Sequence, residues 1–469
     1  MEGGRTPVQW GARLVVPSAP ADLAVMGGTV ITARGRRQTN VYVRDGLIRA
    51  IVDERLPAKE TVDATGLQVL PGAIDGHVHF QDPGDTTRED FTSGSSAAAV
   101  GGVTTVIEHT HSDPVRTVAF LREKIAHASE RSLVDFGLAA HAWPDDIGQH
   151  ADLWHAGVTF FKVFTCTTHG IPAFDAAGLL RVFRELAAID ALCLVHCEDE
   201  SITADAERAL KAAGRRDPGI LSEWRNREAE LTALNTVALL ARITQVAAIA
   251  AHVSHPAAVD VLQAERARGA KLWVETCPQY LYLREDEVIE HAGFRKFTPP
   301  ARVRSQLDSD EMWRRVSSSG VTHISTDHAP STRKQKTDGS IWDVHFGLPG
   351  VETTLNLLIS AAIDGLLTLE RVVELTSDAP ARLYGLQGRK GRLVAGADAD
   401  LVLIDLAAQR VLRDEDVISK AGWTPYAGRR IRGRIASTYV RGALVAQSGK
   451  PIADAGSGRY LPGRGLRTG

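Results

Sequence analysis

Short apolar segments rich in Val, Ile and Phe alternate with helix-like segments through the middle of this chain, and this alternation limits the folds available to it. The apolar segments are residues 68–81, 103–110, 134–141, 158–164, 191–197, 247–255, 271–278 and 321–330. Nearly continuous apolar strands that alternate with helices predict a parallel sheet covered by helices on both faces. Eight such units within about 310 residues favour a (β/α)8 TIM barrel, an α/β fold, over a doubly wound sheet.

The two ends of the chain have a different pattern. Residues 22–70 and 391–449 contain short strands separated by glycines, with an Arg-Asp-Gly turn in the first of these regions. We therefore predict a small β-sandwich domain built from both termini. The expected segments are 1–70 and 388–469 for its two parts, with 71–387 for the barrel between them. The final "GSGRYLPGRGLRTG" has the composition of a loose tail.

Composition and charge exclude several classes of protein. The 54 basic and 57 acidic residues nearly cancel, so the chain lacks the electrostatic footprint of a protein that binds nucleic acid or an anionic membrane. No apolar run approaches the roughly 18 residues of a membrane span, and the first residues do not resemble a signal peptide. The four cysteines form no C-x-x-C pair, which is typical of a reduced, cytoplasmic protein.

The segment "PGAIDGHVHFQDPG" places His77 and His79 at the end of an apolar strand. Alternation along a strand puts both imidazoles on one face, as two ligands of one metal ion must be. Two histidines at this spacing also occur by chance. The pair alone is therefore about as consistent with a chance occurrence as with a metal site.

Further polar residues stand in or at the ends of later strands. Lys162 lies in the fourth, His196 and His252 end the fifth and sixth, and Asp327 ends the eighth. Each has an ordinary alternative, since either histidine can be a hydrogen-bonded core residue and Asp327 can cap the next helix. Barrel enzymes perform chemistry at the carboxyl ends of their strands. Convergence at five strand ends favours a functional site.

Lys162 lies in "FFKVF", within a strand expected to be buried on both faces. An unpaired ammonium group there costs several kcal/mol. The side chain can extend to solvent instead. Alternatively, a deprotonated lysine takes up carbon dioxide to give a carbamate, whose two oxygens can bridge two metal ions.

Eight motifs, in order, resemble the cyclic amidohydrolases: "DGHVHFQDPG", "GGVTTVIE", "FFKVF", "VHCED", "HVSH", "ETCPQYL", "STDHAP" and "GLPGVET". This family contains hydantoinases, dihydropyrimidinases, allantoinases and dihydroorotases, and the resemblance extends to "RKGRLVAGADADLVLID" and "TPYAGRRIRGRI" near the C-terminus. It implies a small-molecule substrate, a homo-oligomer (tetramer or dimer) and a centre of two divalent metal ions, usually Zn²⁺.

The resemblance also assigns roles to the six residues. His77, His79 and Asp327 would bind the more buried metal, His196 and His252 the more exposed one, and a carboxylated Lys162 would bridge both. A metal-bridging hydroxide would open a cyclic amide or ureide to a carbamoyl acid, with Asp327 as the proton shuttle and catalytic residue.

Four positions bear on the substrate. Gln81 and His111 replace an arginine and an asparagine that bind the substrate carboxylate in dihydroorotases. Thr167 replaces a tyrosine of D-selective hydantoinases, and Phe346 replaces a hydantoinase asparagine. We therefore expect a neutral ring, of the allantoinase or hydantoinase type. The run "FGLPGVET" leaves dihydroorotase as the alternative, and an inactive scaffold homologue is a third, although such homologues typically lack several ligands.

Overall fold

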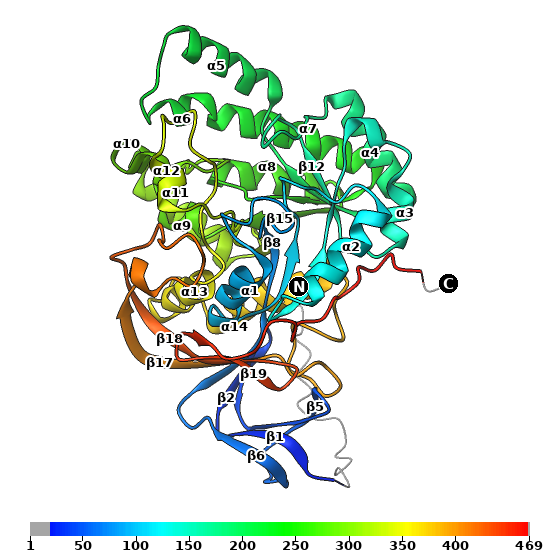
Figure 1. Cartoon of the computed structure of the whole chain (residues 1–469), viewed down its shortest axis with the longest axis vertical. Coiled ribbons are helices and arrows are strands. Elements are labelled where there is room, and N and C mark those ends of the chain that lie inside the picture. The colour runs from blue at the N-terminus through cyan, green and yellow to red at the C-terminus, as the bar shows by residue number, and fades with distance from the viewer. Residues whose placement is uncertain (1–18, 468–469) are drawn as a thin grey trace.

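The structure, a computed structural model, describes residues 19–467. An α/β barrel lies at its centre, with a two-sheet β-sandwich at one end and helices α5 (Glu200–Ala212) and α6 (Ile220–Trp224) at the other (Figure 1). This arrangement confirms the predicted fold class.

Eight positions around the barrel are filled by parallel strands. They are β8 (Ala73–Val78), β9 (Val103–Glu108), β10 (Asp135–Leu138) continued by β11 (Ala140–His141), β12 (Phe161–Phe164), β13 (Leu192–His196), β14 (Ala247–Ala250), β15 (Leu272–Thr276) and β16 (His323–Ile324). The barrel closes between its last and first positions, where the His79 N–H donates to the His328 carbonyl over 2.8 Å and the His328 N–H to the His77 carbonyl over 3.3 Å.

Two of the expected strands differ from the structure. Residues 68–81 were expected to form one strand, but Gly72 separates β7 (Gln68–Pro71), which belongs to the sandwich, from β8. A Cβ at Gly72 would lie 2.1 Å from the Thr104 hydroxyl oxygen, so only glycine fits where the chain crosses into the barrel. The eighth strand, β16, is shorter than residues 321–330, and the backbone turns three residues after it ends, at Asp327, whose φ is 52°.

Helices pack around the barrel in the order in which they follow the strands. They are α1 (Phe91–Val100), α2 (Val118–Ser129), α3 (His150–His155), α4 (Ala176–Ala188), α7 (Arg227–Thr244), α8 (Pro256–Ala267), α9 (Gln279–Tyr282), α10 (Glu287–His291), α11 (Gln306–Ser317), α12 (Arg333–Thr337), α13 (Thr354–Ile363), α14 (Leu369–Val373) and α15 (Ala379–Leu383). In α4, Leu179, Val182, Phe183 and Leu186 form the buried face. This spacing is that of an amphipathic helix.

The sandwich combines both ends of the chain, as predicted. One sheet has the order β5 (Leu47–Val52), β4 (Asn40–Arg44), β1 (Ala21–Met26), β6 (Ala58–Asp63). The other has the order β20 (Lys450–Pro451), β19 (Ala443–Gln447), β18 (Arg430–Val440), β17 (Leu401–Val411), β7, β2 (Thr29–Thr32), β3 (Gly35–Gln38). Because β7 pairs with β17 and leads directly into β8, the sandwich fixes the start of the first barrel strand.

The C-terminal segment is not loose as far as residue 467. Its backbone pairs with the third barrel strand, where the Leu461 N–H donates to the Phe136 carbonyl over 2.7 Å. The Leu461 side chain is 1% exposed and joins the apolar cluster that contains Ile107 and Phe160. Gly463 allows a close backbone approach, since a Cβ there would lie 2.2 Å from the Val158 carbonyl oxygen. Figure 1 shows this red segment running past α2.

Two further sequence expectations concern cysteines and membranes. The cysteines at 166, 193, 197 and 277 are all buried and unpaired. Among residues 19–467, no helix combines the length and apolarity needed to cross a membrane.

Leu461→Ala tests the role of the C-terminal segment. We expect the free energy of unfolding to fall by about 2–4 kcal/mol, because the substitution leaves a cavity in an apolar cluster. Denaturant unfolding measures this change. Leu466→Ala is the control, since Leu466 is 41% exposed and its truncation should cost less than about 0.5 kcal/mol. Equal effects of the two substitutions would contradict a buried role for Leu461.

Candidate metal centre

The six ligand-type residues expected from the sequence meet at one mouth of the barrel. His77 and His79 stand at the end of β8, Lys162 lies in β12, and His196 ends β13. His252 and Asp327 lie just beyond β14 and β16. They line one small cavity together with His111, Phe164, His169, Thr298, Ala329, Phe346 and Gly347.

Three acceptor atoms converge at the first part of this cavity. The Asp327 Oδ1 lies 3.2 Å from the His77 Nε2 and 3.1 Å from the His79 Nε2. The Lys162 Nζ lies 3.2 Å from the same His77 nitrogen. Asp327 does not cap the next helix, because α12 is capped by the Thr332 side chain.

Hydrogen bonds on the far side of each ring determine which nitrogen faces the cavity. The His77 Nδ1 donates to the Glu275 carboxylate over 2.8 Å. The His79 Nδ1 donates to the His109 carbonyl over 2.6 Å. Burial alone would raise the pKa of Glu275, but His77 and His323 hold it well below its usual range, so this carboxylate is charged. Both Nε2 atoms therefore present lone pairs to the cavity.

A second pair of imidazoles faces the other part of the cavity. The His196 Nδ1 and the His252 Nε2 lie 2.9 Å apart. The His196 Nε2 lies 2.9 Å from the Glu198 carboxylate, to which it donates, so its Nδ1 is a lone-pair donor to a cation. The His252 backbone N–H donates to Glu275 over 3.1 Å, which links the two pairs.

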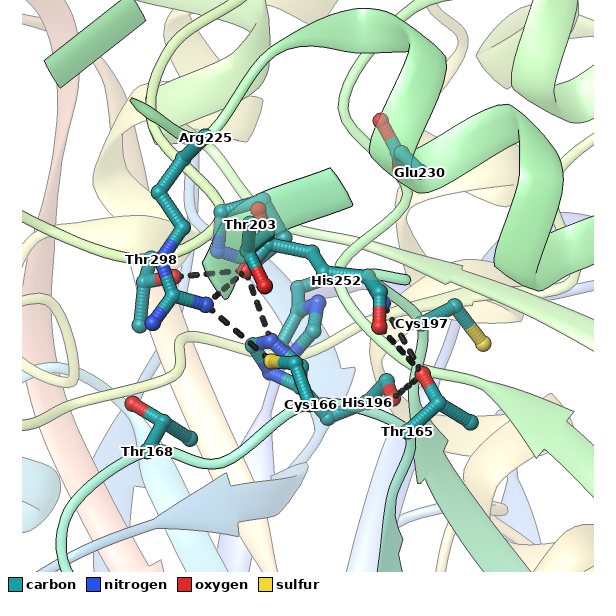
Figure 2. A network of polar contacts seen from close by, with 12 residues as sticks. Thr165, Cys166, Thr168, His196, Cys197, Thr203, Arg225, Glu230, His252 and Thr298 are labelled. Carbon is teal, nitrogen blue, oxygen red and sulfur yellow. Dashed lines mark hydrogen bonds and ion pairs between the residues drawn. The ribbon is translucent and has the colours of Figure 1, made fainter. Parts of the chain in front are cut away.

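Glu198 is a buried carboxylate held by several donors. Atoms of His196, Arg225 and Thr298 lie 2.9, 2.9 and 2.7 Å from its Oε2. Figure 2 shows these three residues within one network of polar contacts. The Arg302 guanidinium donates to its Oε1 over 2.5 Å. Burial would raise the pKa of Glu198, but the two guanidinium groups hold it well below its usual range. The position of His196 therefore depends on a charged network that spans several loops.

Lys162 is buried among these imidazoles and has no carboxylate salt-bridge partner within the described residues. Burial lowers the pKa of its amine to about 8. The amine is still mostly protonated at physiological pH, but a much larger fraction is neutral than in an ordinary lysine, and the neutral form is the one that reacts with carbon dioxide.

Two of these residues have strained backbones. Asp327 and His252 have φ values of 52° and 40°, in the left-handed region that residues other than glycine rarely adopt. Such conformations cost about 1–3 kcal/mol and cluster at functional sites. Here they turn the two side chains into the cavity directly after their strands end.

The structure separates the four residues that we considered for substrate specificity. His111 and Phe346 line the cavity, whereas Gln81 and Thr167 do not. The side-chain amide oxygen of Gln81 accepts hydrogen bonds from the hydroxyls of Thr110 and Ser112, so Gln81 holds the loop after β9. Thr167 is exposed, and its backbone N–H donates to Glu200.

Other site residues did not enter the sequence predictions. His169, Phe164 and Thr298 line the cavity, and His109 and His141 lie buried beside it at the ends of the second and third barrel strands. The strand-end rule that selected His196 applies equally to His109 and His141. Glu198 and Glu275 follow apolar strand residues and carried no comparable signal.

The arrangement fits a divalent metal ion. The Nε2 lone pairs of His77 and His79 converge with the Asp327 oxygen, while the Nδ1 atoms of both rings are already hydrogen-bonded. Among the described residues, the protein donor near them is the Lys162 amine, 3.2 Å from the His77 Nε2. One ligand atom from each of His77, His79 and His109 lies within 4.8 Å of the others. Imidazole and carboxylate ligands without thiolate suit zinc and other first-row divalent metals.

Comparisons with known proteins agree with this geometry. Residues 68–445 match the model of the amidohydrolase family. An allantoinase of Rubrobacter xylanophilus is 35% identical over 448 residues, covering 94% of this chain and 97% of the relative. An L-hydantoinase of Paenarthrobacter aurescens is 30% identical over 455 residues, covering 94% and 98%. The solved L-hydantoinase (dihydropyrimidinase) from Arthrobacter aurescens has a TM-score of 0.89 at 29% identity, covering 94% of this chain and all of that one. These matches confirm the resemblance inferred from the motifs.

Glu198→Gln tests the charged network. We expect the free energy of unfolding to fall by about 3–5 kcal/mol, because Arg225 would remain buried without a carboxylate partner and Arg302 would keep only Glu230. Chemical denaturation measures the change. Glu207→Gln removes the exposed partner of Lys211 and should cost less than about 1 kcal/mol. If the two substitutions cost the same, the buried network does not carry the stability assigned to it.

Proposed function

Since the chain belongs to the amidohydrolase family, we propose that it hydrolyses a neutral cyclic amide or ureide of the allantoin or hydantoin type to the ring-opened carbamoyl acid. The relatives named allantoinase and L-hydantoinase support this class, because each is matched over nearly its whole length. The proposal includes a cytoplasmic, homo-oligomeric enzyme, as the family resemblance implies.

The convergence of three acceptor atoms carries this proposal. The Nε2 lone pairs of His77 and His79 face the Asp327 Oδ1 at 3.2 and 3.1 Å, with their Nδ1 protons committed elsewhere. Three acceptors repel one another unless a cation lies among them, and among the described residues the Lys162 amine is within hydrogen-bonding distance of one of the three, the His77 Nε2. A structural core would instead pair each acceptor with a donor.

We assign His77, His79 and Asp327 to one divalent metal ion and His196 and His252 to a second, with Lys162 between them. Zinc is the ion that this donor set fits best. When bound, the two ions supply an activated water and polarise the carbonyl that is attacked. The carboxylates of Glu275 and Glu198 hold the ligand rings in the required orientation.

Lys162 enters the proposal as a carboxylated side chain. Its lowered pKa of about 8 favours the neutral amine that attacks carbon dioxide. The new N–C bond forms as the amine loses one proton, and the product carries one negative charge. A costly buried cation thereby becomes an anionic ligand with two oxygens.

Asp327 moves the proton in the proposed reaction. Burial raises the pKa of its carboxyl above the usual value, which helps it hold a proton for a short time. It takes a proton from the attacking water and delivers it to the ring nitrogen. This transfer is needed because an amide nitrogen leaves poorly without protonation. Phe164 and Phe346 line the same cavity and limit the access of bulk water.

The lining of the cavity favours a neutral ring. Among residues 19–467, no arginine lines it, so an anionic substrate lacks the bidentate partner that carboxylates prefer. His111 does not replace this partner, since burial above all holds its pKa well below the usual range and leaves it neutral. These observations favour the allantoinase or hydantoinase type over dihydroorotase.

An inactive scaffold is the remaining alternative. Such a protein needs neither a complete ligand set nor charged residues that orient it. All six ligand-type side chains are present at one mouth of the barrel, with Glu275 and Glu198 behind them. This completeness supports an enzyme.

A turnover assay on allantoin, hydantoin, dihydrouracil and dihydroorotate tests the function. At pH 8, where an ordinary histidine is neutral, we expect kcat/KM for the best neutral ring to exceed that for dihydroorotate by about 10- to 100-fold. Chelator treatment should abolish turnover, and Zn²⁺ should restore it. Dihydroorotate as the best substrate would overturn the substrate class, whereas full activity in metal-free protein would overturn the mechanism.

Lys162→Ala tests the bridging role. The variant should bind less metal and lose nearly all turnover, because the two ions lose their shared ligand. A small carboxylic acid in the buffer should restore part of the activity by filling the gap with two oxygens. An amine of equal size is the control, since it supplies none. Unchanged metal content in the variant would contradict a bridging Lys162.

A further inference from the structure

His109 is a buried histidine for which neither the sequence nor the family resemblance gives a role. It follows β9, and its carbonyl accepts the His79 Nδ1 proton over 2.6 Å. The side chain is 1% exposed, and both ring nitrogens are buried without a hydrogen-bond partner. A buried polar group without a partner is destabilising, so a native site normally supplies it with one.

The spacing of three rings identifies this partner. A metal–nitrogen bond of about 2.0–2.1 Å puts a ring centroid about 3.2 Å from the metal, so two ligand rings stand about 4.5 Å apart at a right angle and about 5.2 Å apart at a tetrahedral angle. The centroid of His109 lies 4.5 Å from that of His79 and 4.7 Å from that of His77, and those two are 5.2 Å apart. All three separations fit ligands of one ion.

Neighbouring histidines do not meet the same criterion. The His111 ring is 4.0 Å from His79, closer than two adjacent ligands stand. The His141 ring is 6.0 Å from His109, and none of its atoms belongs to a group of converging ligand atoms in the described structure. By contrast, three ligand atoms, one from each of His77, His79 and His109, all lie within 4.8 Å of one another.

We propose that His109 is an additional ligand of the metal ion held by His77 and His79. This inference rests on the proposed function, because it requires that ion. His109 is absent from the cavity lining, so it approaches the ion from the barrel interior and leaves the substrate side open. The first ion then has five protein ligands and the second has three, counting Lys162 for both. The ion with more protein ligands is held more tightly, and the other keeps open positions for the substrate.

Metal affinity and the spectrum of the cobalt-substituted protein test the proposal. The probe is Co²⁺ alone, titrated into apo wild type, His109→Phe and His109→Gln against a competing chelator. We expect the tighter Kd to rise more than about 10-fold in both variants, because even indirect partners of metal ligands are worth about 10–100-fold. The visible absorption should intensify as the ion loses a ligand. His141→Gln is the matched control, since His141 is equally buried with both nitrogens unpartnered, and its Kd and spectrum should stay those of wild type.

The outcomes separate this inference from the proposed function. If wild type binds two Co²⁺ ions and both His109 variants keep its Kd and spectrum, His109 is not a ligand but the proposed function stands. If wild type binds no metal, the proposed function itself fails. If His109→Phe and His141→Gln weaken binding equally, the loss reflects general disturbance of the barrel interior, which also overturns the proposal. Circular dichroism of each variant establishes that the fold is retained.

Discussion

A single buried carboxylate, Glu275, connects most of the site. It accepts the His77 ring proton and the His252 backbone N–H, and it lies 3.4 Å from the His323 ring. These partners come from three different positions of the barrel. Because Glu275 takes up the donor side of His77, the ring must turn its lone pair inward, where Asp327 already presents an oxygen. The requirement for a cation therefore originates in a residue that does not line the cavity.

The closure of the barrel and the construction of the site use the same backbone groups. His328 exchanges hydrogen bonds with the backbone of His77 and His79, so the last strand is joined to the first at the two histidines. Asp75 reinforces this joint, since it accepts bonds from the Thr326 backbone and hydroxyl. Asp327 lies between Thr326 and His328, and its unusual φ is held by the bonds on either side. Opening the barrel at this seam would dismantle the ligand set.

The sequence predicted what depends on local pattern and little of what depends on packing between distant segments. Strand periodicity gave the barrel, and the strand-end rule gave the six ligand-type residues. The sequence did not distinguish His111, which lines the cavity, from Gln81, whose side-chain amide oxygen accepts hydrogen bonds from Thr110 and Ser112. That distinction depends on the path of the loop after β9. Leu461 escaped prediction for a similar reason, because glycines that suggest a loose tail also allow close backbone pairing.

Charge balance gives a physical reason for the absence of arginine from the cavity. In the proposed centre, two divalent ions would carry four positive charges, and Asp327, Glu275, a carboxylated Lys162 and the attacking hydroxide would return four. The histidines add none, because burial above all keeps the pKa values of His109 and His141 well below their usual range. The centre is then neutral as a whole, and the electron-rich carbonyl of a neutral ring can approach the ions. An arginine in the same cavity would add an uncompensated cation, and its burial would cost several kcal/mol. A neutral ring is therefore the substrate that this distribution of charge accommodates without a further counter-ion.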